Sequence, residues 1–426
     1  MLDRTIAPPI KDAVHFNLQL KPYEHFTLDN GVPVYAVDGG VEDVLQLELV
    51  FYAGNWFEQQ PLVAAATNSL MKNGTVHKTA FEINEHFEYH GAFFNKSSYN
   101  ETATLTLHTL NKHLSNLLPL MRELITEANY PEQELAIYKQ NKKQSLLVSL
   151  KKNDFVAART LDTCVYGDEH PYGKRAKAEY YDALTVEALR QYYQQYYVNG
   201  QCAIFVAGKM PANIQQLLND HFGQLTLKAP VYKLPIWPTS PAAEKKIRLQ
   251  VDANAVQGAI RIGRPAPARN HPDFIKLLVL NNIFGGYFGS RLMSNIREDK
   301  GYTYGISSYL QNHMQETMLL VATETGVDVC QAAIDEVYKE MELLRTELVG
   351  EEEMSLVRNY MIGTILGDLD GPFHIIGRWK NIILNGLTES YFYNNMDAIK
   401  NTTAEEIRAL AQKYLDPQDF YEVLAI

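Results

Sequence analysis

The sequence is poor in cysteine. It has only three, Cys164, Cys202 and Cys330, which lie far apart in mostly apolar surroundings. An odd number at these spacings excludes both a disulfide framework and a zinc-ribbon pattern. We expect all three to be small buried side chains in a protein that stays in a reducing compartment.

Long apolar runs are also absent. No window approaches the roughly 18 uninterrupted apolar residues that a membrane-spanning helix needs. Residues 1–9 contain neither an apolar stretch of signal-peptide length nor a small-residue cleavage site. The sequence therefore predicts a cytoplasmic protein with no membrane partner.

The sequence has fewer basic than acidic residues. Lys and Arg number 39 against 50 Asp and Glu, which gives a formal net charge of -11. An acidic surface repels nucleic acid and anionic membranes, so neither is expected as a partner. The hydrophobic fraction of 46% and the charged fraction of 21% are those of a globular protein. A chain of 426 residues exceeds what one hydrophobic core usually serves, which predicts two or more domains.

Strand and helix patterns follow one another along the first half. Residues 44–52 alternate apolar and polar side chains, which predicts a half-buried strand. Thr79 with Glu82 three residues later is a capping-box pattern, and Gly91 ends the helix that it starts. Further strands are expected at residues 32–37, 102–107 and 201–208, and helices at residues 62–73, 114–125, 131–165 and 185–197.

Residues 228–245 interrupt this order. They contain four prolines and no apolar period, which is typical of an extended linker. A similar order of elements then repeats. It predicts strands at residues 246–251, 258–263, 302–310 and 317–323, and helices at residues 272–283, 289–297, 327–345 and 351–366. We therefore predict two related α+β domains, with residues 1–228 as the first, 229–245 as the linker and 246–426 as the second.

Three stretches resemble the insulinase/pitrilysin metallopeptidase family, which includes mitochondrial-processing-peptidase-like proteins. The first runs from Gly31-Val-Pro-Val through Phe51-Tyr-Ala-Gly-Asn55 to Lys72-Asn-Gly-Thr75. The second is His170-Pro-Tyr-Gly173 with the helix into Tyr196-Tyr-Val-Asn199. The third and most specific runs from Gly285-Gly-Tyr-Phe-Gly-Ser-Arg-Leu292 through Ile296-Arg-Glu-Asp-Lys-Gly-Tyr-Thr-Tyr304. The resemblance implies two homologous halves that close like a clam around a chamber, each a mostly antiparallel sheet with helices on one face.

The zinc site that this family implies is missing. Active members carry His-x-x-Glu-His on a helix of the first half, where both histidines reach one zinc ion and the glutamate acts as general base. Counting back from Gly74-Thr75 places these positions on Ala65, Asn68 and Ser69, and the later glutamate ligand falls near Ser145. Alanine has no donor atom, and amide and hydroxyl groups are poor zinc ligands. We expect no metal and no cofactor in this chain.

Other catalytic patterns are weaker. His86 and His90 are four residues apart with Glu88 between them, but the order is neither His-Glu-x-x-His nor its inverse. Solvated side chains are the simpler interpretation of this helix, and His170 in its turn is expected to be structural. Gly-x-Ser-x-Gly is absent, so a serine nucleophile of that kind is excluded.

The sequence retains the residues that the family carries in its second half. Arg297 and Tyr304 match the family's arginine and tyrosine, which reach toward the scissile bond in active members. The resemblance implies that Arg297 anchors the substrate backbone and Tyr304 stabilises the tetrahedral intermediate, although packing and ordinary ion pairing are the plain alternative. The glycines of the preceding loop, Gly285, Gly286 and Gly289, are expected either to bind substrate or to let another backbone approach closely.

This combination predicts the zinc-free subunit of a two-chain peptidase. A zinc-bearing homologous subunit would supply metal, water and base, and unfolded or small peptides would be the substrate. The alternative is a non-catalytic scaffold or peptide-binding subunit of the same fold. A free-standing hydrolase built on His86, Glu88 and His90 is the third interpretation.

Overall fold

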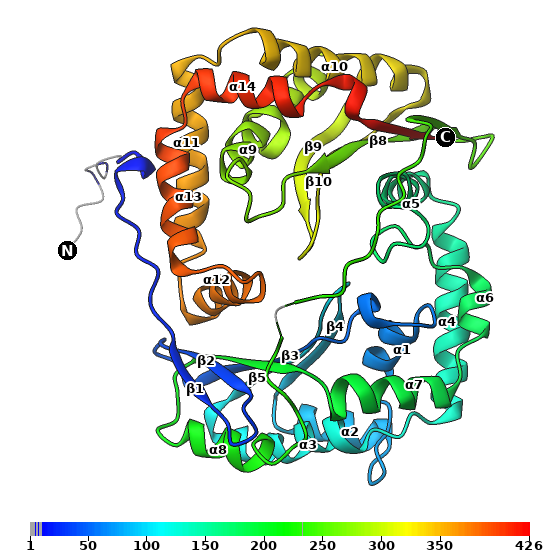
Figure 1. Ribbon diagram of the computed structural model, residues 1–426, viewed down its shortest axis with the longest axis vertical. Coiled ribbons are helices and arrows are strands. Elements are labelled where there is room, and N and C mark those ends of the chain that lie inside the picture. Colours follow the sequence, from blue (N-terminus) through cyan, green and yellow to red (C-terminus); the bar gives the residue numbers. More distant parts are fainter. Residues whose placement is uncertain (1–4, 6, 8–10, 232) are drawn as a thin grey trace. The chain divides into compact units, whose positions relative to one another are not determined.

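The chain folds into two compact units, each assembled from separate stretches of sequence (Figure 1). The computed structural model describes residues 5, 7, 11–231 and 233–426. Unit 1 contains the described part of Met1–Leu20, together with Ile260–Asp370 and Leu387–Phe420. Unit 2 contains Lys21–Ala259, Gly371–Gly386 and Tyr421–Ile426. The predicted domain boundaries at residues 228 and 245 are not tested by this division and stay a prediction.

A six-stranded sheet lies at the centre of unit 2. Its spatial order is β1-β2-β6-β3-β5-β4, so β1 and β4 are the edge strands. Neighbouring strands are antiparallel except for β2 and β6, which are parallel. The six strands are β1 Glu24–Thr27, β2 Pro33–Asp38, β3 Val44–Phe51, β4 Phe93–Ser98, β5 Ala103–Leu110 and β6 Cys202–Gly208.

Helices cover this sheet on both faces. The unit contains α1 Val63–Leu70, α2 Ala80–Tyr89, α3 Leu114–Glu127, α4 Glu132–Ser149, α5 Asn153–Tyr166, α6 Ala178–Asp182, α7 Val186–Tyr193, α8 Ile214–Phe222 and α12 Pro372–Leu384. The alternating apolar side chains of β3 form one core with α1, α2, α3, α7 and α8. Helix α12 lies on the opposite face, where it contacts β2 and β6 (Figure 1).

The α12 face of the sheet carries a buried charge. Glu48 of β3 is only 5% exposed, and its two carboxylate oxygens accept hydrogen bonds from Lys380 Nζ at 2.8 and 2.7 Å. Trp379 next to it donates from Nε1 to the main-chain oxygen of Lys21 at 2.8 Å. A helix that follows β3 by more than three hundred residues is thus held on its sheet by polar contacts.

Local signals in the sequence correspond closely to the observed ends of helices. Thr79 Oγ1 accepts from the Glu82 main-chain N–H at 3.3 Å, and Glu82 Oε2 accepts from the Thr79 N–H at 2.8 Å, so the predicted capping box is confirmed. Gly91 has φ +59°, as expected after a helix. The helical structure predicted over residues 131–165 is confirmed, and it is divided into α4, which ends at Ser149, and α5, which starts at Asn153.

The proline-containing segment is irregular, as expected. Residues 229–231 and 233–245 contain no helix or strand. Two tryptophans hold the segment in place within unit 2. Trp56 Nε1 donates to the Pro235 oxygen at 2.9 Å, and Trp237 Nε1 donates to the Trp56 oxygen at 3.2 Å. The segment is therefore ordered by side-chain contacts rather than by regular structure.

The remaining strands lie in two groups, one in each unit. Within unit 1, β8, β10 and β9 follow one another, and β9 is an edge strand that pairs antiparallel with β10. Within unit 2, β7 and β11 pair in parallel. The strands are β7 Lys246–Leu249, β8 Gln257–Ala266, β9 Thr303–Asn312, β10 Thr317–Gly326 and β11 Tyr421–Ala425. The helices of unit 1 are α9 Phe274–Asn281, α10 Cys330–Thr346, α11 Glu351–Gly367, α13 Glu389–Asn401 and α14 Ala404–Tyr414. The predicted mixed α+β architecture with two sheets is confirmed.

Candidate functional site

Helix α1 carries the three positions that the resemblance assigns to zinc ligation and general base. Ala65 and Ser69 are partly buried, and Asn68 is 2% exposed. The Asn68 amide donates to the Tyr197 hydroxyl at 3.3 Å, so it serves the core. The side chains at these three positions offer one hydroxyl and one amide already in use, which is no zinc site.

A glutamate that the sequence did not reveal caps this helix. Glu58 accepts hydrogen bonds from the main-chain N–H groups of Leu62 at 3.0 Å and Ala64 at 3.2 Å. Leu62 has φ +72°, an unusual conformation for a branched side chain, directly before the helix. Burial raises the pKa of Glu58 from 4.5 to about 7, although both hydrogen bonds act against this rise. No local sequence pattern marks such a cap, because Glu58 lies four residues ahead of the first N–H it accepts from.

This pKa gives a pH prediction. Between pH 4.5 and 7 the folded protein keeps a proton that the unfolded chain has released, so stability falls as pH rises across this window and the loss is complete above it. Glu58→Gln cannot titrate. We expect the free energy of unfolding of the natural chain to fall by about 3 kcal/mol relative to Glu58→Gln between pH 4.5 and 8. Urea titrations at several pH values measure this, and parallel profiles for the two proteins would contradict it.

A lysine lies at the other end of α1. Lys96 of β4 donates from Nζ to the main-chain oxygen of Ser69 at 2.5 Å. Burial, together with the nearby charge of Lys72, lowers the pKa of Lys96 to about 7. This lysine was not singled out in the sequence, because its burial depends on the packing of β4 against α1.

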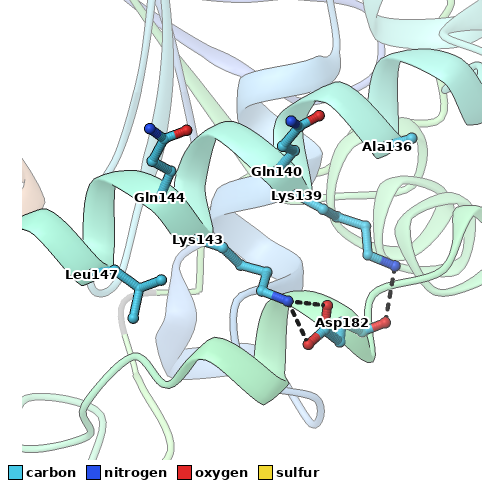
Figure 2. Close-up of a pocket in the computed structure, with 7 residues that line it drawn as sticks. All are labelled: Ala136, Lys139, Gln140, Lys143, Gln144, Leu147 and Asp182. Atoms are coloured by element: carbon cyan, nitrogen blue, oxygen red, sulfur yellow. Dashed lines mark hydrogen bonds and ion pairs between the residues drawn. The ribbon is translucent and has the colours of Figure 1, made fainter.

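Ser145, the position nearest to the expected third zinc ligand, is exposed on α4. The same helix lines a shallow hollow with α6 (Figure 2), and the residues around it are Ala136, Lys139, Gln140, Lys143, Gln144, Leu147 and Asp182. Its charged groups are already engaged. Lys143 Nζ bonds both Asp182 carboxylate oxygens at 2.7 and 2.8 Å, and Lys139 Nζ bonds two main-chain oxygens. We see no reactive group in this hollow.

His86 of α2 and His90, the residue that follows this helix, are engaged in hydrogen bonds. His86 Nε2 lies 3.1 Å from the Asn116 oxygen, and His90 Nδ1 lies 2.8 Å from the His86 oxygen. A carbonyl oxygen only accepts, so these nitrogens carry hydrogen and cannot bind metal in this arrangement. Across residues 11–231 and 233–426, no three His, Cys, Asp or Glu side chains are grouped so that they could hold a metal ion.

His170 and the three cysteines are buried side chains. His170 is 2% exposed, and its Nδ1 accepts from the Tyr172 N–H at 3.2 Å, which agrees with a structural role in its turn. The prediction that all three cysteines are buried is confirmed. Burial raises the pKa of Cys164 and Cys202, which makes both thiols less reactive.

Arg297 and Tyr304 lie together in unit 1. Arg297 belongs to the wide helical turn Met293–Asp299, and Tyr304 is the second residue of β9. Arg297 Nε donates to the main-chain oxygen of Tyr304 at 3.1 Å. The guanidinium carbon lies 4.7 Å from the centre of the Phe288 ring, and Nη1 lies 3.6 Å from Glu298 Oε1. The Tyr304 side chain is 95% exposed, so its hydroxyl is accessible to a ligand.

The glycines of the preceding loop are packed closely. A Cβ atom on Gly285 would lie 2.7 Å from Ser308 Cβ and 2.8 Å from a Leu292 methyl, which leaves no room for a side chain. On Gly286 and Gly289 it would lie 3.0 Å from the Asn281 amide and 2.8 Å from the Tyr287 ring. The neighbouring atoms belong to side chains, so the close approach of another backbone and substrate binding by these glycines both stay predictions.

Part of the chain matches a known family model. Residues 183–361 match the family model described as Peptidase M16 inactive domain. Over these residues the chain is similar to that family, which belongs to the insulinase/pitrilysin class of peptidase-like proteins.

The chain is also similar to individual proteins. The chain is 24% identical to the Bacillus subtilis protein called "Uncharacterized zinc protease YmxG". The matched 346 residues cover 80% of this chain and 82% of that protein. It is 21% identical over 301 residues to the Helicobacter pylori "Non-peptidase homolog YmxG", covering 69% and 68%. The crystal structure of a peptidase M16 inactive domain from Pseudomonas fluorescens superposes with a TM-score of 0.86 at 22% identity, over 95% of this chain and 98% of that one. No helix within the described ranges is long and apolar enough to cross a membrane.

Proposed function

We propose that this chain is the zinc-free subunit of a two-chain peptidase of the insulinase class. The observation that carries the proposal is the contrast between the arginine–tyrosine pair, which is present, and the zinc-binding positions, which are altered. Arg297 and Tyr304 are held next to each other, whereas Ala65, Asn68 and Ser69 cannot bind zinc. A homologous subunit with an intact site would supply the metal ion, the nucleophilic water and the general base.

Arg297 has the geometry of a positioning group. Its Nε is fixed on the Tyr304 oxygen, and the Phe288 ring supports one face of the guanidinium. Glu298 is too distant from Nη1 for a short hydrogen bond, so the planar donors on that side can reach a carbonyl or carboxylate oxygen of a peptide. In this role Arg297 binds and orients the substrate.

Tyr304 supplies a hydroxyl donor. Attack of water on a peptide bond places negative charge on the carbonyl oxygen, and a preorganised hydroxyl stabilises that charge. The exposed Tyr304 side chain sits on β9, an edge strand to which an extended peptide can add through main-chain hydrogen bonds. Strand addition of this kind requires an unfolded or small peptide.

Mixing the purified chains tests the proposal. This chain and a zinc-bearing homologue from the same organism are assayed with a quenched fluorescent peptide, separately and together. Cleavage only by the mixture, abolished by a chelator and restored by zinc, is the expected result. A complex that forms but cleaves nothing would favour the scaffold or peptide-binding alternative. Chelator-sensitive cleavage by this chain alone would overturn the proposal.

A further inference from the structure

The wide helical turn that carries Arg297 is a π-helix. At its end the Lys300 N–H donates to the Asn295 oxygen, five residues back, at 3.0 Å. Turns of this kind are rare, and they often occur at functional sites. The backbone of the turn determines where the Arg297 side chain begins and in which direction it leaves. Contacts that hold the turn therefore also determine where the guanidinium lies.

Asn295 ties this turn to helix α10. Its Nδ2 donates to Glu336 Oε2 at 2.9 Å and to Glu340 Oε1 at 2.7 Å, so a single amide joins two carboxylates. The two glutamates lie one helical turn apart on the same face of α10. Hydrogen bonds to charged groups are stronger than those between neutral groups. The turn is thus held by two strong bonds that start only two residues before Arg297.

The two carboxylates depend on this amide. Glu340 is 7% exposed, and burial raises its pKa, whereas the bond from Asn295 and the charge of Arg291 act against the rise. The hydrogen bond from Asn295 is also the largest cause that lowers the pKa of Glu336. Lys300 Nζ lies 3.8 Å from Glu336 Oε1 and offsets part of the negative charge. An acceptor in place of the amide would face two further acceptors, and the turn would lose its attachment to α10.

We propose that Asn295 is a positioning residue, which through Glu336 and Glu340 holds the Arg297 guanidinium in the direction that binds substrate. The inference rests on the proposed function, because that function gives Arg297 its role. Asn295 itself does not touch the substrate. The bond from Arg297 Nε to the Tyr304 oxygen fixes the guanidinium at its far end, and Asn295 fixes the backbone from which the side chain starts. Loss of the Asn295 bonds lets the Nε group leave the Tyr304 oxygen.

The first test observes Arg297 directly and needs no peptidase activity. The Nε–H group of Arg297 in the ¹⁵N-labelled chain is assigned by its absence from Arg297→Lys, and its exchange with water is measured by NMR. Asn295→Asp keeps the shape of the side chain but removes the donor. We expect exchange about 10-fold faster than in the natural chain, since two hydrogen bonds to charged groups are lost. Asn359→Asp is the control with the same change in net charge, because its amide donates to the Ser355 oxygen of its own helix at 3.1 Å.

An exchange of the two groups separates a specific anchor from general damage to the fold. Asn295→Asp combined with Glu340→Gln again gives one amide and two carboxylates, so the amide now at position 340 can donate to the carboxylate at position 295. We expect this double variant to recover most of the slow exchange of the Arg297 Nε–H. Natural exchange in Asn295→Asp, an equal increase in Asn359→Asp, or no recovery in the double variant would overturn the inference.

The second test uses peptide cleavage with the zinc-bearing subunit in excess. Asn295→Asp should raise KM about 10-fold and leave kcat nearly unchanged, because Arg297 binds the substrate rather than stabilising its transition state. A lower kcat at constant KM would contradict the positioning role. If the natural chains together cleave nothing, the proposed function fails, while the NMR measurement still decides whether Asn295 holds Arg297.

Discussion

Tyr304→Phe is expected to lower the rate of peptide cleavage by the mixed subunits by about 100- to 1000-fold, which is the typical effect of removing one preorganised oxyanion donor. The change deletes a single hydroxyl from a side chain that is 95% exposed, so the thermal stability of the chain should not move. The measurement is kcat for a quenched peptide with the zinc-bearing subunit in excess. Because the interaction forms in the transition state, kcat should fall while KM stays nearly constant.

Tyr309→Phe is the matched control, because Tyr309 lies on the same strand and is 42% exposed. We expect it to keep the natural rate. An unchanged rate with Tyr304→Phe would eliminate the proposed role of Tyr304, and equal losses in both variants would point to a general disturbance of β9.

Lys380→Met should be the most destabilising of the simple substitutions considered. It leaves the Glu48 carboxylate, which is 5% exposed, buried on the sheet without its partner. Breaking a buried pair by removing one member typically costs 3–5 kcal/mol. The Lys380 side chain is 29% exposed and water screens part of the interaction, so we expect the lower end, about 3 kcal/mol. Urea unfolding followed by circular dichroism measures this loss.

The double variant Glu48→Gln with Lys380→Met should recover most of that stability, because no charge is then left unpaired. Lys143→Met serves as a surface control: its partner Asp182 has a side chain that is 59% exposed, and we expect a loss below about 1 kcal/mol. A loss at Lys380 no larger than at Lys143 would show that the buried pair does not hold α12 in place.

Much of the fold could be predicted because its signals are local. Alternating side chains predicted β3 within one residue of its observed end, and the capping box at Thr79 predicted the start of α2. Features that depend on distant residues could not be predicted in this way. Nothing in the sequence near residue 380 indicates that α12 packs on a strand at residue 48, since the pairing is 332 residues apart in the chain.

The candidate site also has features that can be predicted from local sequence and features that cannot. The absence of zinc ligands at Ala65, Asn68 and Ser69 can be read from residue identity alone, because no conformation gives alanine a donor atom. Glu58 and Lys96 could not be found from the sequence, because their importance comes from burial at the two ends of α1. Burial is a property of the assembled sheet and helices, and a single charged residue in a sequence gives no sign of it.

Unit 2 is assembled from separate stretches of the sequence, and this affects how it folds during translation. Residues 21–259 emerge first, yet α12 and β11 of the same unit come from Gly371–Gly386 and Tyr421–Ile426. During translation the Glu48 face of the nascent sheet therefore stays exposed to solvent until α12, whose Lys380 lies 332 residues after Glu48, has been synthesised. A premature stop codon anywhere before α12 would leave this early intermediate permanently unfinished and exposed to chaperones and proteases.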